Sequence, residues 1–479
     1  MNRHRYPVFE RISVLALMGV AAATNAEDLQ TVYDHALIAD PAMQQAEAIH
    51  MASRETRTQA ILNMLPLNAA ASKTWFGGGL PNGQSYHGNT PPLGSLGLQV
   101  NLFSWDNWVA LRQANSTVAQ AEANYLTAQQ SLIARVSQQY FAVLAAKDTL
   151  TAQQSALDSY SHQLDQAERR FEVGLIAVTD VQTARAASDS AAAAVIAAKQ
   201  ALANQEELLR AITGEKYQSL AAPGDGMPLL TPTPASEDAW VTVALSQNAG
   251  LTASHLNQEI AHDAYLTALG GHLPTLNATA SRYWDLSSRN GNGTSVTIPQ
   301  GGAGAGSTNS NIDTKNIVWS VGVTVPIFSA GATQSRVRQA KYLENAAKAG
   351  YELSLRQTEQ QSRNAYQGVI SQIAQVGALK QAVESNSVAL KATQAGYGVG
   401  TKTAIDVLTA VQNLVQAQTN YAQAKYNYLN NIVALRLAAG NLSRTTVTEI
   451  NGWLSPAAAA AATPSPAALP VTPGPATTH

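Results

Sequence analysis

Two glycine-containing stretches hold the side chains whose types and spacing could do chemistry, residues 170–180 and residues 395–406. Their polar candidates are a hydroxyl, two carboxylates, a phenol and an ammonium, on Thr179, Asp180, Asp406, Tyr397 and Lys402. A phenol donates a hydrogen bond to a carboxylate, and an ammonium forms an ion pair with one. These residue types therefore favour reversible polar links over covalent catalysis.

The rest of the sequence holds no motif of a known enzyme class. It has no His-Glu-x-x-His, no Gly-x-Ser-x-Gly and no Walker motif, and the glycine-to-lysine spacing in residues 396–403 is wrong for a phosphate loop. The glycine run at residues 301–306 lies in a polar loop without a following helix. His255, His262 and His272 share a region without the spacing of metal ligands. We predict no enzyme activity, no cofactor and no metal site.

The two glycine-containing stretches are corresponding parts of a sequence repeat. Gly174 reappears as Gly400, at an offset of 226 (400 minus 174). The same offset relates further pairs: Asp180 and Asp406, Arg112 and Arg338, Tyr125 and Tyr351, Tyr140 and Tyr366, Asn204 and Asn430. We predict an internal duplication, with a first structural repeat at residues 27–226 and a second at residues 227–454. Each glycine could be only a turn residue, and each aspartate only the N-cap of the next helix.

Seven-residue repeats flank both stretches and predict long helices that pack as coiled coils. One apolar seam of the first half consists of Val136, Val143, Leu150, Leu157, Leu164 and Phe171. A seven-residue period implies a left-handed supercoil, and the companion positions here are mostly small or polar. Residues 104–172 lack proline and glycine. At about 1.5 Å per residue this helix reaches ~100 Å, the length of a stalk or a tunnel.

Segments of alternating apolar and polar residues separate the helices. They cover residues 96–102, 276–286 and 317–327, and polar loops at residues 77–94 and 287–316 join the strands of each pair. Alternation over about ten residues is typical of transmembrane β-strands, although an ordinary half-buried sheet shows the same pattern. Four strands per chain leave open edges that lipid cannot satisfy, so we predict that several chains share one closed barrel.

The two ends of the chain differ in composition from its helical body. Residues 1–26 combine a basic start, a short apolar run and a small-residue exit, which predicts a secretory signal peptide rather than a membrane anchor. Residues 455–479 are rich in alanine, proline and threonine and predict a disordered tail. The lack of cysteine excludes a disulfide framework, and a net charge of -2 without a basic patch argues against nucleic-acid binding.

Several motifs resemble those of the TolC-type outer-membrane channels of efflux pumps and type I secretion systems. They lie at residues 173–184, 272–276, 325–328, 395–408 and 426–430, and the resemblance covers residues 27–453. It implies a mixed α and β membrane protein, a homotrimer with a twelve-stranded β-barrel (four strands per chain) continuous with a long α-helical coiled-coil barrel.

The same resemblance implies an exit duct in the cell outer membrane of a Gram-negative bacterium, in contact with outer-membrane lipid and with its helical tunnel in the periplasm. A periplasmic adaptor protein and an inner-membrane transporter would open it. The alternative is a structural or adhesive periplasm-spanning stalk anchored by a shared barrel.

The resemblance also implies roles for individual side chains at the helical tip. The expected gate links, which close the periplasmic entrance, involve Thr179, Asp180, Tyr397 and Lys402. Asp406 is expected to form a pore selectivity ring that favours cations. The expected adaptor contacts lie at the tip turns, on Val173, Gly174, Leu175, Val399, Gly400 and Thr401.

Two residues depart from the pattern of the family. Lys402 replaces an arginine, which loses the bidentate fork of a guanidinium. Thr409 replaces a second aspartate of the selectivity ring. We therefore predict one acidic ring instead of two, and a gate that is less tightly latched.

Overall fold

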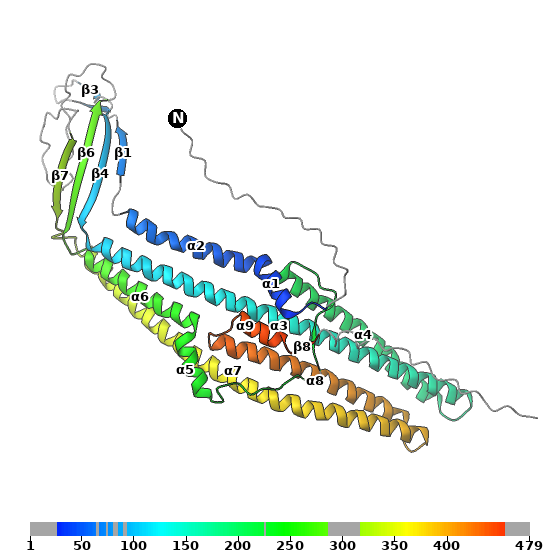
Figure 1. Cartoon of the computed structure of the whole chain (residues 1–479). Helices are drawn as coiled ribbons and strands as arrows, with labels where there is room; N and C mark the ends of the chain where they lie inside the picture. Colours follow the sequence, from blue (N-terminus) through cyan, green and yellow to red (C-terminus); the bar gives the residue numbers. More distant parts are fainter. Residues whose placement is uncertain are drawn as a thin grey trace, which may run out of the picture.

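The computed structural model describes residues 26–63, 67–72, 75–79, 85–89, 93–224, 227–285 and 317–455. These residues form one elongated body, with a β-sheet at one end and the turns of two long helical hairpins at the other (Figure 1). Residues 1–25 of the predicted signal peptide, residues 456–479 of the predicted tail and the predicted loop at residues 287–316 lie outside the described residues.

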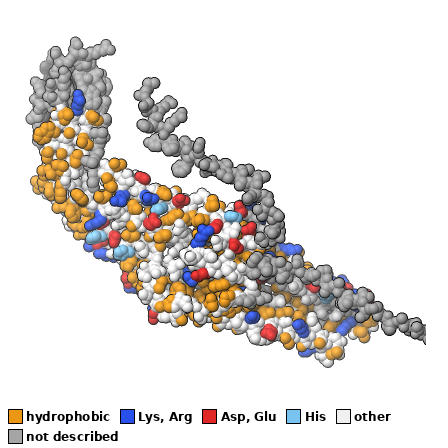
Figure 2. Space-filling model, in the orientation of Figure 1, with side chains coloured by type: hydrophobic (Ala, Val, Ile, Leu, Met, Phe, Trp, Pro, Cys, Tyr) orange, Lys and Arg blue, Asp and Glu red, His pale blue; other side chains and the backbone are white. Residues whose placement is uncertain are grey.

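A four-stranded antiparallel sheet occupies one end of the body, in the order β1-β4-β6-β7. Its strands are β1 (Leu67–Ser72), β4 (Leu93–Phe103), β6 (Thr275–Asp285) and β7 (Ile317–Thr324). The strands β4 and β6 pair in the middle, with Leu98 opposite Ala280, so the two halves of the chain meet inside one sheet. Hydrophobic side chains gather over this end (Figure 2), and Trp319 on β7 is 77% exposed. The predicted strands are confirmed.

A small hairpin occupies part of the segment at residues 77–94 that the sequence predicts to be a polar loop. The strand β2 (Trp75–Gly79) pairs with β3 (Ser85–Asn89), with Trp75 opposite Asn89. Aromatic residues flank the glycines here, and aromatic residues favour strands. Pairing also satisfies backbone groups that an open loop would leave to solvent.

Four long helices form the other end of the body: α3 (Trp105–Glu172), α4 (Val178–Thr213), α7 (Ala332–Gly398) and α8 (Ala404–Ala438). The helix α3 has 68 residues, which corresponds to about 100 Å, and it begins one residue after the predicted start. On the predicted seam Val136 and Val143 are buried, and small residues such as Ala156 and Ala167 are buried as well. The hairpins α3–α4 and α7–α8 therefore pack closely through small side chains, and α3 lies against α8.

Two shorter helices precede each strand pair. In the first half these are α1 (Leu29–Ala39) and α2 (Pro41–Leu62), and in the second half α5 (Glu237–Gln247) and α6 (Ala249–Gly270). A capping side chain stands at the break within each pair: Asp40 accepts from the backbone N–H of Met43 at 3.3 Å, and Asn248 accepts from that of Leu251 at 3.0 Å. Each half thus contains two shorter helices, two strands of the main sheet and a long helical hairpin, in that order.

The main hydrophobic core lies midway along the body, where the two hairpins meet α1 and α9 (Arg444–Asn451). Its largest buried side chains include Tyr140, Phe141, Tyr426 and Leu429. Tyr140 lies in the core, and its hydroxyl donates to the carbonyl of Ala221 at 2.7 Å. The burial of Tyr140 raises the pKa of its phenol.

Contacts between the two ends of the described chain close this core. The backbone N–H of Leu29 donates to Oδ1 of Asn451 at 3.1 Å, and Nδ2 of Asn451 donates to Oδ2 of Asp28 at 2.7 Å. Next to them β5 (Ala222–Pro223) pairs with β8 (Leu454–Ser455), so Ser455 belongs to a strand rather than to the start of the expected tail. Among the helices that the structure describes, none has an apolar stretch long enough to cross a membrane.

Candidate functional site

The two hairpins end in turns with the same backbone geometry, which we call the first tip turn (residues 173–177) and the second tip turn (residues 399–403). Gly174 has φ +74° and Gly400 has φ +79°, in the left-handed region that glycine adopts without strain. The N–H of Leu175 donates to the carbonyl of Arg170 at 2.8 Å, and the N–H of Thr401 donates to that of Gly396 at 2.8 Å. Both turns are therefore Schellman motifs, and both glycines are turn residues as the sequence predicts.

Large apolar side chains project from both tip turns into solvent. Val173 is 70% exposed, Leu175 is 72% exposed and Val399 is 78% exposed. Val178 and Ile405, at the starts of the returning helices, are also exposed. Apolar side chains exposed together at the end of a molecule are typical of a surface that meets a partner.

The second tip turn leads into α8 through a capping box. Thr403 is the N-cap, and its hydroxyl accepts from the N–H of Asp406 at 3.2 Å. One carboxylate oxygen of Asp406 accepts from the N–H of Thr403 and from its hydroxyl, each at 2.9 Å. The alternative that Asp406 itself is the N-cap is therefore wrong by three residues.

These contacts stabilise the charged form of Asp406. The hydrogen bond from the backbone of Thr403, then the one from its hydroxyl, and then the nearby ammonium of Lys402 hold the pKa of the Asp406 carboxyl below its usual value. Asp406 thus carries a full negative charge at neutral pH. A carboxylate with this charge is what a cation-selective ring needs.

The first tip turn leads into α4 without a side-chain cap. Ala177 is the N-cap there, and its methyl group cannot accept a hydrogen bond. Asp180 lies in the first turn of α4, so the alternative that it is the N-cap is also wrong. Instead of a cap, a small apolar cluster of Ala167, Val181 and Ala184 holds α4 against α3.

Tyr397 is the most buried of the predicted gate residues. It lies in the last turn of α7 and is 6% exposed. The guanidinium carbon of Arg170, at the end of α3, lies 4.3 Å from the centroid of the Tyr397 ring. One Arg170 nitrogen also donates to the carbonyl of Tyr397 at 3.5 Å. This pair joins the two hairpins of one chain directly beside both tip turns.

The remaining predicted gate residues lie at the surface of the single chain. Thr179 and Lys402 are exposed and Asp180 is half-buried, while Thr409 is exposed one turn beyond Asp406. Within the described residues of one chain, no hydrogen bond or ion pair joins Thr179 or Asp180 to Tyr397 or Lys402. The predicted gate links therefore stay predictions.

Arg170 is the residue at this site that sequence reasoning missed. A cation in the last turn of a helix is common because it interacts favourably with the helix dipole, so its presence there gave no reason to pair it with an aromatic ring. The one sequence feature that could have drawn attention to Arg170 is its position at the start of the repeated stretch, residues 170–180. Its partner comes from the other repeat, and no offset between equivalent positions connects the two residues.

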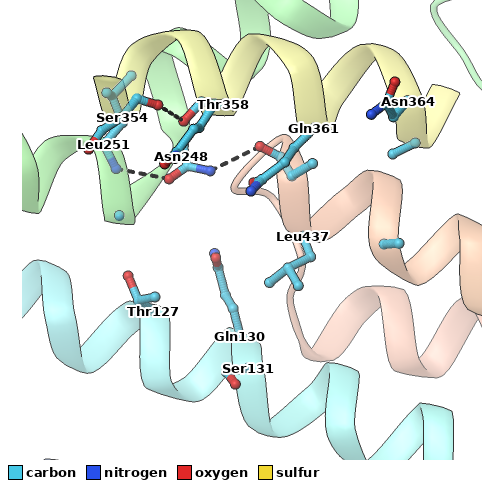
Figure 3. A pocket seen from close by; sticks show the side chains of 15 residues that line it. Thr127, Gln130, Ser131, Asn248, Leu251, Ser354, Thr358, Gln361, Asn364 and Leu437 are labelled. Atoms are coloured by element: carbon cyan, nitrogen blue, oxygen red, sulfur yellow. Dashed lines mark hydrogen bonds between the residues drawn. The ribbon is translucent and has the colours of Figure 1, made fainter. Parts of the chain in front are cut away.

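A cleft of about 790 Å³ lies where α3, α6, α7 and α8 converge (Figure 3). The side chains that line it are uncharged, and they include Thr127, Gln130, Asn248, Thr358, Gln361 and Asn364. Asn248 donates to the carbonyl of Ala438 at 3.0 Å, and Gln130 donates to that of Gly440 at 2.8 Å. The lining offers no acid, base or thiol nucleophile, and these hydrogen bonds hold helix ends together.

Comparisons with known proteins agree on one family. The family model described as "Outer membrane efflux protein" matches residues 32–215 and 240–441. The outer membrane protein TolC of Escherichia coli (strain K12) is 33% identical over 441 residues, which cover 92% of this chain and 88% of that protein. The alkaline protease secretion protein AprF of Pseudomonas aeruginosa is 26% identical over 424 residues, which cover 86% of this chain and 84% of that protein.

A solved structure shows the same fold. The crystal structure of the CmeC outer membrane channel of Campylobacter jejuni superposes with a TM-score of 0.71 at 19% sequence identity. The match covers 95% of this chain and 98% of the CmeC chain. The arrangement of sheet, mid-body core and long hairpins is therefore that of an outer-membrane channel.

Proposed function

The chain belongs to the outer membrane efflux protein family. We propose that its helical tips form the gate of the channel. The protein is an exit duct of the outer membrane for efflux or type I secretion, with its helical part in the periplasm, and it is not an enzyme. The observation that carries the gate proposal is the second tip turn, where a buried tyrosine, a lysine and an ionised aspartate lie within ten residues.

The duct is a homotrimer with a twelve-stranded barrel, built by an internally duplicated chain. Among the described residues, β1 and β7 each pair with one strand only, which supports the shared barrel because an edge strand in lipid must pair with another strand. Four strands from each of three chains make twelve. The equal order of elements in the two halves supports the duplication.

The gate closes through contacts between neighbouring helices at the tips. Tyr397 and Lys402 hold the second hairpin to Thr179 and Asp180, either within one chain or across to the next. The exposure of Lys402 in the single chain supports the second possibility for this residue, because an exposed ammonium can reach a neighbouring carboxylate. By threefold symmetry Asp406 forms a ring of carboxylates around the axis.

A periplasmic adaptor docks on the tip turns, and an inner-membrane transporter supplies the work. The exposed apolar side chains Val173, Leu175 and Val399 support this docking surface. Gly174, Gly400 and Thr401 complete the surface because they set the direction in which those side chains point. The name of AprF assigns alkaline protease secretion to that relative. In this duct the transporter decides which cargo enters.

The double substitution Tyr397→Phe with Lys402→Ser tests the gate. It removes the phenol hydroxyl and the ammonium, so we expect a several-fold rise in single-channel conductance in planar bilayers. Thr401→Ser is the matched control, because serine keeps the hydroxyl that donates to the carbonyl of Gly396 at 3.1 Å. Equal conductance in the double variant, the control and the unaltered protein would remove Tyr397 and Lys402 from the gate.

A further inference from the structure

The contact between Arg170 and Tyr397 has a role that goes beyond holding two helices side by side. Arg170 has an exposed neighbour of the same type, Arg169, in the same last turn of α3. Only Arg170 reaches across to α7, where its guanidinium lies over the Tyr397 ring at 4.3 Å. A guanidinium that lies over an aromatic ring is attracted electrostatically to the face of the ring. This attraction is stronger where water is excluded.

The environment of Arg170 leaves this ring as its main partner. Among the described residues no carboxylate forms an ion pair with Arg170, while Glu168 two positions earlier pairs with Arg185 of α4 at 2.8 Å. The ring of Tyr397 is almost fully buried, so the stacked guanidinium and the ring exclude water from each other. An arginine placed in this way fixes the orientation of the ring, and with it the position of the phenol hydroxyl.

The same arginine also touches the backbone that builds the second tip turn. The carbonyl of Tyr397 accepts from the N–H of Gly400 at 3.2 Å, which is one of the two bonds of the Schellman motif. It also accepts from Arg170 at 3.5 Å. The carbonyl of Arg170 in turn accepts from Leu175 in the first tip turn. One residue therefore contributes its backbone to the first turn and its side chain to the second.

From this geometry we infer that Arg170 is the positioning residue of the gate, which couples the two tip turns of one chain into a single rigid unit. It orients the phenol of Tyr397 toward its gate partner and keeps the second turn in register with the first. The inference rests on the proposed gate function of Tyr397. It adds a residue that acts through Tyr397 rather than in the gate link itself.

The test combines two measurements on the full-length trimer, amide hydrogen exchange at residues 399–401 and single-channel conductance. We expect Arg170→Ala to speed exchange at these amides about tenfold, because it removes both the stacking and the bond to the carbonyl. Conductance should rise in the same variant. Arg170→Lys keeps a cation over the ring and should restore most of both properties.

Three further single variants and one double variant test whether the coupling is specific to Arg170 and the Tyr397 ring. Arg169→Ala removes an exposed cation from the same helical turn and should change neither measurement. Tyr397→Phe keeps the ring and should leave exchange unchanged, whereas Tyr397→Leu removes the ring and should speed exchange as much as Arg170→Ala does. In the double variant of Arg170→Ala and Tyr397→Leu the two effects should not add.

The outcomes separate this inference from the proposed gate. Unchanged exchange in Arg170→Ala, or equal effects of Arg169→Ala and Arg170→Ala, would overturn the role of Arg170. Faster exchange with unchanged conductance would support the coupling and would count against the gate at Tyr397. A rise in conductance in Arg170→Ala without faster exchange would also overturn the inference, because the arginine would then act on the pore without holding the turn.

Discussion

The two tip turns of this chain have one backbone geometry and two different kinds of side-chain support. Both turn through a glycine with positive φ and both close with the same pair of backbone hydrogen bonds. Beyond the glycine they differ. The second turn is capped by Thr403 and Asp406, whereas the first has Ala177 at the N-cap position and relies on the apolar cluster around Ala167.

The difference shows that the backbone of a turn and its chemistry are set by separate residues. The glycines determine the path of the chain, and the polar residues of the second turn are then free to serve a gate. Arg170, which precedes the first turn at the end of α3, contacts Tyr397 beside the second turn. In the proposed gate, the second turn supplies the polar side chains, and Arg170 beside the first turn holds Tyr397 in place.

The largest expected effect separates the two aspartates. Asp406→Ala should weaken the block of the open channel by divalent cations about tenfold or more, because it removes the whole proposed ring. Asp180→Ala should leave this block unchanged. Thr409→Asp should strengthen the block by adding a second ring. Conductance recordings with increasing divalent cation measure all three, and equal block in Asp406→Ala would place this residue off the pore axis.

The next largest effect is the loss of turn stability when either tip glycine is replaced, and it should be equal at the two turns. Gly174→Ala and Gly400→Ala force a methyl group onto a left-handed backbone, at a cost of about 1–2 kcal/mol each. Apart from the glycine and its two chain neighbours, no described residue has a heavy atom within 4 Å of the added methyl group in either case, so the expected cost is backbone strain. Hydrogen exchange at each turn measures the cost. A clear difference between the two variants would contradict the equality of the two backbones.

A smaller effect is expected from two substitutions that remove the capping box of the second turn and introduce one at the first turn. Thr403→Ala removes the capping box and should destabilise the start of α8 by about 1 kcal/mol. Ala177→Thr should create the equivalent box with Asp180, because Ala177 already has the extended backbone of an N-cap (φ -81°, ψ 155°), and should stabilise the start of α4 by about 0.5 kcal/mol. Amide exchange in the first turns of α4 and α8 reports both. A loss of stability in Ala177→Thr would show that the first turn cannot accept a cap.

The smallest effect is the pH dependence of the cap. The pKa of Asp406 is lowered in the folded protein, so the stability that its cap contributes is fully present above the usual aspartate pKa of 3.8 and is lost as the pH falls through the lower folded value. Block by divalent cations should therefore persist from pH 7 down to pH 4. A loss of block between pH 6 and pH 5 would mean that repulsion across the ring outweighs the contacts with Thr403.

The sequence predicted the parts of this structure that depend on regular patterns. The helix from Trp105 to Glu172 followed from its seven-residue repeat, and the strands followed from their alternation, because both patterns place apolar side chains on one face of an element. The glycine turns followed from the repeat. The hairpin of β2 and β3 was not predicted, because short strands rich in glycine carry no clear alternation.

The finer features of the tips depend on contacts between residues far apart in sequence. The aspartates were interpreted as possible N-caps, but the structure gives this position to Thr403 and Ala177, three residues earlier in each helix. The contact of Arg170 with Tyr397 depends on how the two hairpins pack, and no local pattern records that packing. The links from Tyr397 and Lys402 to the first repeat remain predictions for the same reason.

The hydrogen bonds between Asn451 and the first described helix have a consequence for the order of folding. Asn451 binds Leu29 and Asp28 across separations of 422 and 423 residues, so the mid-body core joins the first and last parts of the described chain. Contacts at such separations form late, because a very long loop must close first. A chain that emerges N-terminus first therefore completes its core only after α9 has appeared. A chain truncated before α9 lacks the hydrogen bonds of Asn451 to Leu29 and Asp28.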